Sequence, residues 1–428
     1  MPGHLSSDPR RLLEGLFDAA VRSALPRHRM AAHLPPAPRG RTVVVGAGKA
    51  AASMAEELEH CWPGELSGVV VTRYGHGKPL RRVQVLEAAH PVPDAAGERA
   101  ATAILETVGR LTEDDLVICL LSGGGSALLS LPAPGVDAAE KRAINLQLLR
   151  SGAPIGDINC IRRHLSAIKG GRLAAACHPA RVHTILISDV AGDDPMDIAS
   201  GPTVADPTTS RDAMTLLDRY DITVSRSLRA RLAAGELESI KPGDPVLARS
   251  SLAMMATPYG ALQAAAGAAE QAGVPAFVLG DRWEGEAKDV GRAMAGLALH
   301  VARGEGPFPL PCVVLTGGET TVTVRGQGRG GRNVQFLLSL LLSLQGAPNV
   351  YALAADTDGV DGIAPIAGAF IGPTSLARSA NLPRSARDYL EDDDGHGFFQ
   401  GLGDSIVTGP TYTNVNDFRA VLILPASR

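Results

Sequence analysis

The chain has 428 residues and a formal net charge of −4, with 41 basic residues against 45 acidic ones. Because domains average about 150 residues, this length predicts two or three domains. The acidic excess and the 4% content of aromatic residues argue against a nucleic-acid-binding protein, which needs a basic surface and rings for stacking. The longest leucine-rich run, 336–344, is too short to span a membrane, so we expect no membrane partner.

The cysteines and the N-terminus indicate where the protein works. Five cysteines at irregular spacing, without a Cys-x-x-Cys pair, fit a reducing compartment. The polar start, with Pro2, Asp8 and Pro9, is unlike a signal peptide. We therefore expect a cytoplasmic location.

The predicted elements begin with an amphipathic helix in an N-terminal helical segment, 1–38, whose packing the sequence leaves open. Strand-like runs then alternate with helical patterns, and the runs before residue 245 are 42–45, 68–72, 83–87, 116–121 and 183–188. After a stretch rich in proline and glycine, further runs follow at 276–279, 313–315, 321–324, 350–355, 367–372, 405–408 and 420–424. This alternation is typical of parallel sheets covered by helices on both faces. It predicts two α/β domains, a Rossmann-like one at 39–245 and a C-terminal one at 246–428.

Two glycine-rich loops follow predicted strands, at the position where open parallel sheets bind ligands. Residues 46–51 read Gly-Ala-Gly-Lys-Ala-Ala, which fits either a dinucleotide fingerprint or an anion site with Lys49 in the first helical turn. Residues 122–126 read Ser-Gly-Gly-Gly-Ser, which predicts a nest of backbone N–H groups for phosphate. An ordinary flexible turn is the alternative for the second loop.

Two acidic stretches also follow predicted strands. In the first, Asp189, Asp193, Asp194 and Asp197 lie within nine residues. Two carboxylates about 6 Å apart repel by roughly 3 kcal/mol at an effective dielectric near 20. A Mg²⁺ ion, which typically binds one or two carboxylates plus substrate phosphates, would relieve this repulsion. A capped helix start on the surface is the alternative. The second stretch, around Asp358, lacks the length and the distal glutamate of an EF-hand.

The stretch 316–335 combines Glu319 with Arg325, Arg329 and Arg332 among several glycines. Guanidinium groups bind phosphate or carboxylate through paired hydrogen bonds, and glycines let backbone N–H groups approach the same anion. This pattern predicts an anion site with a metal-binding carboxylate beside it. A solvated basic loop and an RNA-binding Arg-Gly tract are the alternatives, and the acidic balance of the chain argues against the second.

Two further basic features are associated with predicted helices, one on a helix and one before a helix. On one predicted helix, Arg162, Ser166 and Lys169 form a stripe beside the apolar face, and the glycines at 170–171 end the helix. The stripe either projects into a binding site or is the solvated side of the helix. His90 precedes another helix and either touches a substrate or is structural.

Taken in order, these segments resemble the class II glycerate kinases, the glycerate 2-kinase family whose C-terminal part is called the MOFRL domain. The matching stretches are 45–50, 90–94, 121–128, 162–173, 187–194, 200–203, 316–320, 328–333, 355–362 and 408–417. They place the MOFRL-like region at about 311–420. The chain departs from the family pattern at Arg163, where lysine is expected, at Tyr412, where glycine is expected, and in 248–259.

The resemblance implies two unlike three-layer α/β/α domains with mostly parallel sheets and the active site in the cleft between them. It implies ATP and Mg²⁺ as cofactors and D-glycerate as the small-molecule substrate. The γ-phosphoryl group would pass to the 2-hydroxyl of D-glycerate, which gives 2-phosphoglycerate and ADP. We expect no nucleic-acid partner, and a homodimer stays open.

The resemblance also implies roles for the residues singled out above. Lys49 and Arg332 would stabilise the transferring phosphoryl group, and Asp189 or Asp358 would orient or deprotonate the glycerate hydroxyl. The glycerate carboxylate would contact His90, Arg162 and Lys169, and the Mg²⁺ ligands would come from Asp189, Asp193 and Glu319. The nucleotide phosphates would contact Ser122, Gly123, Gly124, Gly125, Ser126, Arg325 and Arg329.

The main alternative is an NAD(P)H-dependent hydroxypyruvate reductase, which the Gly-x-Gly-x-x-Ala pattern at 46–51 invites. Hydride transfer, however, does not need several acidic clusters and a loop with three arginines. The sequence therefore favours the kinase.

Overall fold

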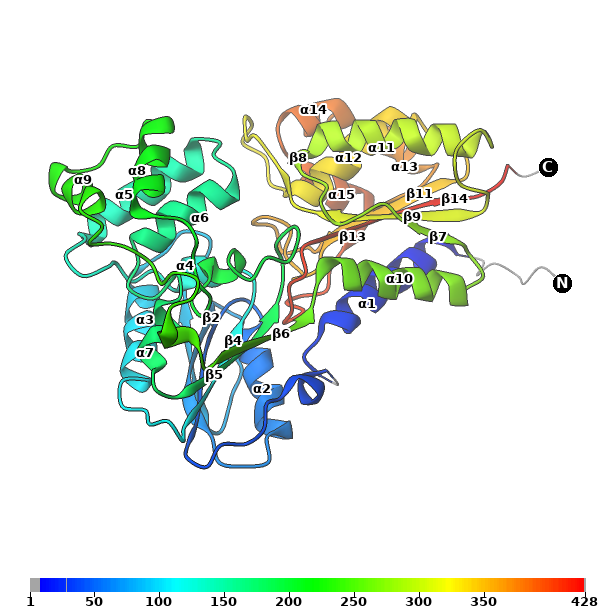
Figure 1. The fold of residues 1–428 in the computed structure, drawn as a ribbon. Coiled ribbons are helices and arrows are strands. Elements are labelled where there is room, and N and C mark those ends of the chain that lie inside the picture. Colours follow the sequence, from blue (N-terminus) through cyan, green and yellow to red (C-terminus); the bar gives the residue numbers. More distant parts are fainter. Residues whose placement is uncertain (1–7, 28, 427–428) are drawn as a thin grey trace. The chain divides into compact units, whose positions relative to one another are not determined.

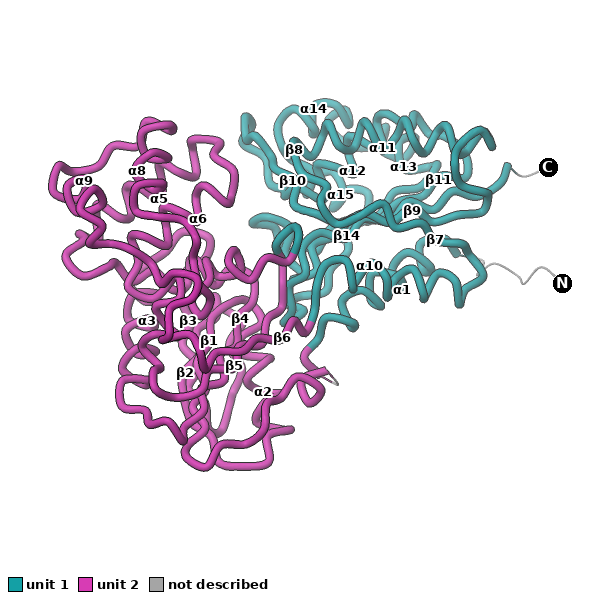
Figure 2. Tube along the Cα trace, viewed as in Figure 1, with its two compact units in different colours: residues 1–25, 190–192, 256–428 teal, residues 26–189, 193–255 magenta. Residues whose placement is uncertain are grey.

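The computed structural model describes residues 8–27 and 29–426. The chain forms two compact units (Figure 2): unit 1 comprises Met1–Leu25, Val190–Gly192 and Ala256–Arg428, and unit 2 comprises Pro26–Asp189 and Asp193–Met255. The domain boundary expected near residue 245 lies about ten residues too early, because the chain first adds strand β6 (Ser250–Ala256) to the sheet of unit 2. The N-terminal helix, α1 (Pro9–Ala24), belongs to unit 1.

Unit 2 is built on a sheet with the strand order β3-β2-β1-β4-β5-β6 (Figure 1). Neighbouring strands from β3 to β5 run parallel, as predicted. These strands are β1 (Thr42–Ala47), β2 (Ser67–Arg73), β3 (Val83–Ala88), β4 (Leu116–Leu121) and β5 (Arg181–Ile187). The chain adds strands on one side of β1 and then, from β4 on, on the other. The carboxyl ends of β1 and β4 therefore meet at a topological switch point, where such sheets bind ligands.

Helices cover both faces of this sheet, with α2 (Ala51–Cys61) on one face and α3 (Ala95–Thr107) and α7 (Arg172–Cys177) on the other (Figure 1). The remaining helices of unit 2 include α4 (Gly125–Leu128), α5 (Ala138–Arg150), α6 (Ile155–His164), α8 (Ser210–Arg219) and α9 (Arg226–Ala233). A second apolar core joins α5, α6, α8 and α9, with Ile144, Ile161, Leu217 and Leu232 among its members. This helical layer lies next to the strand ends and supplies part of the site described below.

The helix predicted to carry Arg162, Ser166 and Lys169 ends earlier than expected. The structure ends α6 at His164, and α7 begins only at Arg172. The hydroxyl of Ser166 accepts the backbone N–H groups of Ile168 and Lys169 at 3.2 and 3.3 Å. A side chain that satisfies the backbone in this way competes with the helix, which explains the early end.

Unit 1 contains a sheet with the order β13-β12-β11-β14-β9-β7. Its strands are β7 (Ala276–Val278), β9 (Cys312–Gly318), β11 (Val350–Asp356), β12 (Gly368–Ile371), β13 (Ser405–Ile406) and β14 (Asp417–Ile423). The expectation of mostly parallel strands is wrong for this sheet. Only β7 and β9 are parallel, whereas β9–β14, β14–β11, β11–β12 and β12–β13 are antiparallel. Apolar runs reveal strands but not their direction, which depends on how the connections return to the sheet.

Helices also cover both faces of this second sheet, so each unit has three layers, as predicted. On one face lie α1 and α10 (Pro258–Gln271), and on the other lie α11 (Ala287–Ala302) and α12 (Arg332–Leu344) (Figure 1). Most apolar side chains of α12, such as Phe336, Leu337 and Leu340, are fully buried. Shorter helices complete the unit: α13 (Ser375–Arg378), α14 (Ala386–Glu391) and α15 (Gly395–Leu402).

The strand expected at 321–324 is largely missing. Only β10 (Thr320–Thr321) forms, paired in parallel with β8 (Gly285–Glu286). Residues 322–331 instead form an irregular loop, because the backbone N–H groups of Arg325 and Gly326 donate to the side chain of Asp393 rather than to a neighbouring strand. Within the described residues, no helix is long and apolar enough to cross a membrane.

The close approach of β1 and β4 depends on Gly46. A Cβ atom at this position would lie 2.4 Å from the carbonyl oxygen of Leu120, so there is no room for a side chain at position 46. We predict that Gly46→Ala destabilises unit 2 by about 2 kcal/mol, which corresponds to a Tm lower by about 4–8 °C in calorimetry.

The matched control is Gly267→Ala on α10, where an added Cβ meets nothing within 4 Å. This substitution should leave Tm unchanged or raise it slightly, because alanine favours a helix over glycine. An unchanged Tm for Gly46→Ala would contradict the packing described here.

Candidate active site

The loops after β1 and β4 are held together by backbone and side-chain hydrogen bonds. The N–H of Lys49 donates to the carbonyl of Gly123 at 2.8 Å, and the N–H of Ala50 donates to Ser122 Oγ at 3.0 Å. A Cβ at Gly48, whose φ is +136°, would lie 2.1 Å from Ser122 Oγ. Glycine is therefore required at this position. Lys49 precedes α2, whose N-cap is Ala50, rather than lying in its first turn as expected.

Three of the predicted residues lie close together at this edge of the sheet. A Cβ built on Gly124 would lie 3.0 Å from the ring of His90 and 3.4 Å from Cγ of Lys49. Gly124 has a φ of +81°, which glycine adopts without strain. Lys49, His90 and the glycine loop therefore form one cluster, in which a side chain at Gly124 would occupy the space between the other two.

A hydrogen-bonded chain connects the glycine loop to the helical layer. Ser126 Oγ lies 2.7 Å from Ser200 Oγ, which donates to Asn159 Oδ1 at 3.0 Å. The amide of Asn159 in turn donates to Asp197 Oδ1 at 3.0 Å. Asp197, one of the four clustered carboxylates, also lies 3.5 Å from Arg163 and so is part of this internal network.

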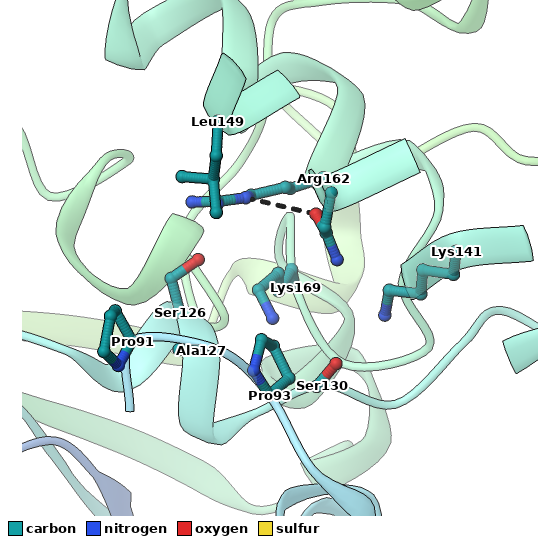
Figure 3. A pocket seen from close by; sticks show the side chains of 10 residues that line it. Pro91, Pro93, Ser126, Ala127, Ser130, Lys141, Leu149, Arg162 and Lys169 are labelled. Carbon is teal, nitrogen blue, oxygen red and sulfur yellow. Dashed lines mark hydrogen bonds between the residues drawn. The ribbon is translucent and has the colours of Figure 1, made fainter. Parts of the chain in front are cut away.

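A narrow pocket adjoins Ser126. Its walls include Pro91 and Pro93, which follow His90, together with Arg162 and Lys169 (Figure 3). The space inside is about 20 Å³, room for roughly one water molecule. The structure thus gathers Ser126, Arg162 and Lys169 around one pocket, although the last two do not share a helix.

The acidic stretch after β5 contains the two predicted metal ligands of unit 2. Asp189 and Asp193 are both half-buried, and Asp193 adopts a φ of 57° in the loop that follows. Over residues 8–27 and 29–426, no three His, Cys, Asp or Glu side chains gather into a metal cluster. Two carboxylates nevertheless suffice for Mg²⁺ when substrate phosphates complete its coordination.

In unit 1, Arg332 lies at the centre of a carboxylate cluster at the start of α12. Its Nε donates to Asp417 at 2.7 Å, one Nη donates to Glu319 at 2.7 Å, and the other donates to Asp356 and Asn416, each at 3.1 Å. Burial disfavours the charge of Arg332, but Asp417, Glu319 and Asp356 outweigh this effect and hold its pKa above the usual value. Glu319 is the exposed partner, with 57% of its side chain accessible, whereas Asp417 is fully buried.

A second layer of polar residues supports this cluster. Asp361 accepts the N–H groups of Asn333 and Val334 at 3.1 and 3.0 Å and so holds the first turn of α12. Burial raises the pKa of Asp361 to about 6, and the two N–H groups act in the opposite direction. The buried Arg419 donates to the other oxygen of Asp417 at 2.6 Å.

The other predicted residues of unit 1 are not part of the Arg332 cluster. Arg325 and Arg329 are exposed on the loop, where their backbone N–H groups donate to Asp393 and Asp394. Asp358 is fully buried, and its Oδ1 accepts the N–H of Val360 at 2.8 Å. Their assignments to nucleotide and substrate remain predictions.

Two family models match the chain. A domain of unknown function, DUF4147, matches residues 12–233, and the MOFRL family matches residues 312–417. The second match lies within the region expected at about 311–420. Among similar proteins, the D-glycerate 2-kinase of Thermotoga maritima is 34% identical over 418 residues, which cover 97% of this chain and 96% of that protein. The chain belongs to the class II glycerate kinase family.

Other members of the glycerate kinase family are similar over almost their whole length. The glycerate kinase of Homo sapiens is 33% identical, with 96% of this chain and 92% of that protein covered. A protein of Agrobacterium vitis is 51% identical, with 97% of this chain and 94% of that protein covered, and its name provisionally describes it as a hydroxypyruvate reductase. The crystal structure of the Thermotoga maritima glycerate kinase matches with a TM-score of 0.86 at 34% identity, over 97% of this chain and 99% of that one.

Several residues of the Arg332 cluster and of the pocket were not predicted from the sequence. In unit 1 these are Asp356, Asn416 and Asp417, although all three lie within stretches that match the glycerate kinase family. In unit 2 the residue is Lys141 on α5, a pocket residue whose exposed fraction is 4%. The spacing of Lys141, Ile144 and Leu148 places the lysine on the buried face of its helix, which was the available signal.

The Arg332 cluster leads to a stability prediction for this glycerate kinase. Asp417→Asn removes the buried charge that faces both Arg332 and Arg419, so it should destabilise unit 1 by about 3 kcal/mol in calorimetry. Asp289→Asn, which breaks a surface pair with Arg292, should cost less than about 0.5 kcal/mol. Equal effects of the two substitutions would contradict the account of a buried charge cluster.

Proposed function

We propose that this chain phosphorylates D-glycerate at its 2-hydroxyl with ATP and Mg²⁺, giving 2-phosphoglycerate and ADP. The observation that carries the proposal is the cluster of Lys49, His90 and Gly124 at the switch point of a parallel sheet. It occurs in a chain that is 34% identical to a D-glycerate 2-kinase over nearly the whole of both proteins.

Phosphoryl transfer requires positioning and neutralisation of charge more than covalent chemistry. Lys49 supplies a cation for phosphate oxygens, and the glycine loop beside it supplies backbone N–H groups. Arg332 supplies a second cation from unit 1. Since Asp417 and Asp356 are buried, the Nη group that faces the exposed Glu319 is the one that can turn to a ligand.

The acceptor would be bound by its carboxylate and activated at its hydroxyl. His90, Arg162 and Lys169 contact the carboxylate in this proposal. The 2-hydroxyl oxygen forms a bond to the γ-phosphorus, the bond from that phosphorus to the bridging oxygen of ADP breaks, and the hydroxyl proton passes to Asp189 or Asp358. The nucleotide phosphates contact the loop 122–126 together with the exposed Arg325 and Arg329.

Asp189, Asp193 and Glu319 are the proposed Mg²⁺ contacts, and their chemistry fits this ion because Mg²⁺ prefers carboxylate oxygens. When bound, Mg²⁺ neutralises negative charge on the nucleotide phosphates. The five cysteines are free, which agrees with the cytoplasmic location that we propose for the enzyme.

The reductase alternative receives less support from the structure. The glycines of a dinucleotide fingerprint let the backbone approach a pyrophosphate. Here, added side chains at Gly46 and Gly48 would collide with Leu120 and Ser122 of the neighbouring loop and strand, so internal packing explains both glycines. The end of β2, which would supply an acid for the ribose of NAD, is Arg73.

A coupled assay separates the two activities. We predict ADP formation that requires D-glycerate and Mg²⁺ together, followed through pyruvate kinase and lactate dehydrogenase. Consumption of NADPH or NADH with hydroxypyruvate, in the absence of ATP and of any glycerate-dependent ADP formation, would contradict the proposal.

Lys49 is the residue of unit 2 whose loss should affect this turnover most. Lys49→Ala should lower kcat by about tenfold or more, because it removes a charge that neutralises the phosphoryl group. The control is Lys78→Ala, whose lysine forms a surface pair with Glu56 at 2.5 Å and should leave kcat within about twofold. Near-normal kcat in a folded Lys49→Ala protein, verified by circular dichroism, would exclude the assigned role.

A further inference from the structure

Three cationic side chains meet at the pocket beside Ser126 without an acidic partner. Lys141 and Lys169 are 4% and 1% exposed, and each donates from Nζ to a backbone carbonyl, Lys141 to Leu131 at 2.8 Å and Lys169 to Leu129. Arg162 donates from Nε to Asn145 at 3.4 Å (Figure 3). Among the described residues, none of these three cations forms an ion pair with a carboxylate.

This arrangement is unusual because buried charges are normally paired. Glu98 is the carboxylate that acts to raise the pKa of Lys141, but it forms an ion pair with Arg142 at 2.8 Å instead. The arginines of the cluster in unit 1 provide a contrast, since Arg332 and Arg419 both contact Asp417. A bound anion in the pocket of unit 2 would supply a counter-charge to Arg162 and would stabilise the charged forms of the two lysines.

The size and the walls of the pocket narrow the class of anion. Its space is small, about 20 Å³, which favours a compact anionic group over a di- or triphosphate chain. The hydroxyls of Ser126 and Ser130 and the amide of Asn145 line the same pocket and offer neutral hydrogen bonds. The prolines on the opposite wall, Pro91 and Pro93, follow His90, which was assigned to the substrate.

We propose that Lys141, together with Arg162 and Lys169, forms a three-cation subsite for the carboxylate of a 2-hydroxy acid. The inference rests on the proposed function in taking D-glycerate as the ligand. It adds Lys141 as a residue that determines specificity for acids over neutral polyols.

The surroundings of Lys141 predict that the carboxylate binds with uptake of a proton. The pKa of Lys141 is lowered from 10.5 to about 7, chiefly by burial; Glu98 on α3 acts to raise it, whereas Arg162 on α6 and Arg172 on α7 act to lower it. Burial, Lys141 and Arg162 likewise hold the pKa of Lys169 well below its usual value. An anion in the pocket stabilises the charged amine and raises these pKa values. Binding therefore takes up protons near and above pH 7, and the apparent affinity should fall as the pH rises.

Isothermal titration calorimetry measures this uptake directly. D-glycerate would be titrated at pH 8 into the nucleotide-free full-length protein in buffers that differ in ionisation enthalpy. A lysine with a pKa near 7 is about nine-tenths neutral at this pH, so the heats should indicate about one proton or more taken up per site. Glycerol, which lacks the carboxylate, should give no saturable heat.

Lys141→Met tests the assignment to this lysine, and replacement of an unpaired buried charge by an apolar chain of similar length should not impair folding. We expect D-glycerate binding at least about tenfold weaker and proton uptake lower by about one per site. The control is Lys78→Met, which should match the wild type. The dependence of the wild-type binding heat on the buffer tests proton uptake without any variant.

Several results would overturn the inference: D-glycerate binding without proton uptake in the wild type, no D-glycerate binding to the folded protein, or unchanged binding by Lys141→Met. If inorganic phosphate binds with the same proton uptake and D-glycerate does not bind, the subsite is a phosphate site. That result would equally reject the carboxylate subsite. These outcomes differ from failure of the proposed function. D-glycerate binding with proton uptake but without ADP formation would reject the kinase and leave the carboxylate subsite in place.

Discussion

The close contact between the ends of β1 and β4 is the constraint on which the site in unit 2 depends. Gly46 lets the two strands approach, Ser122 Oγ accepts the N–H of Ala50, and Gly123 accepts the N–H of Lys49. These bonds fix where α2 starts and where the glycine loop turns. They thereby place Lys49 and Gly124 beside His90. Packing within the chain thus explains the glycines of the motif that resembles a dinucleotide fingerprint. The lysine that follows them, Lys49, is the residue proposed to contact a ligand.

The Arg332 cluster of unit 1 and the pocket beside Ser126 in unit 2 hold positive charge in opposite ways. Unit 1 surrounds Arg332 with carboxylates, so the cluster is satisfied internally and holds one guanidinium in a defined orientation. Unit 2 buries two lysines against backbone carbonyls, and burial lowers their pKa values. The first arrangement is a rigid support for a cation, whereas the second gains most from an anion that arrives from outside. In the proposed function, the first stabilises the transferring group and the second binds the acid.

The sequence predicted the fold class and the strand ends well because continuous apolar runs followed by glycine are strong local signals. The position of β4 was predicted to the residue, and the proximity of Lys49 and Gly124 follows from the ends of β1 and β4, which meet at a switch point. Strand direction in unit 1 could not be predicted, since it depends on the connections. The early end of α6 depends on one hydroxyl, that of Ser166. Tyr412, where the family pattern has glycine, adopts a φ of 62°, which explains why glycine is favoured there.

The most direct test of the central claim is identification of the product by ³¹P NMR. The full-length protein would be incubated with ATP, Mg²⁺ and D-glycerate, and the spectrum would be compared with authentic 2-phosphoglycerate and 3-phosphoglycerate. The account predicts a resonance of 2-phosphoglycerate that grows in step with ADP and is absent when D-glycerate is omitted. ATP that stays intact, or a phosphoryl group on the 3-hydroxyl, would contradict it.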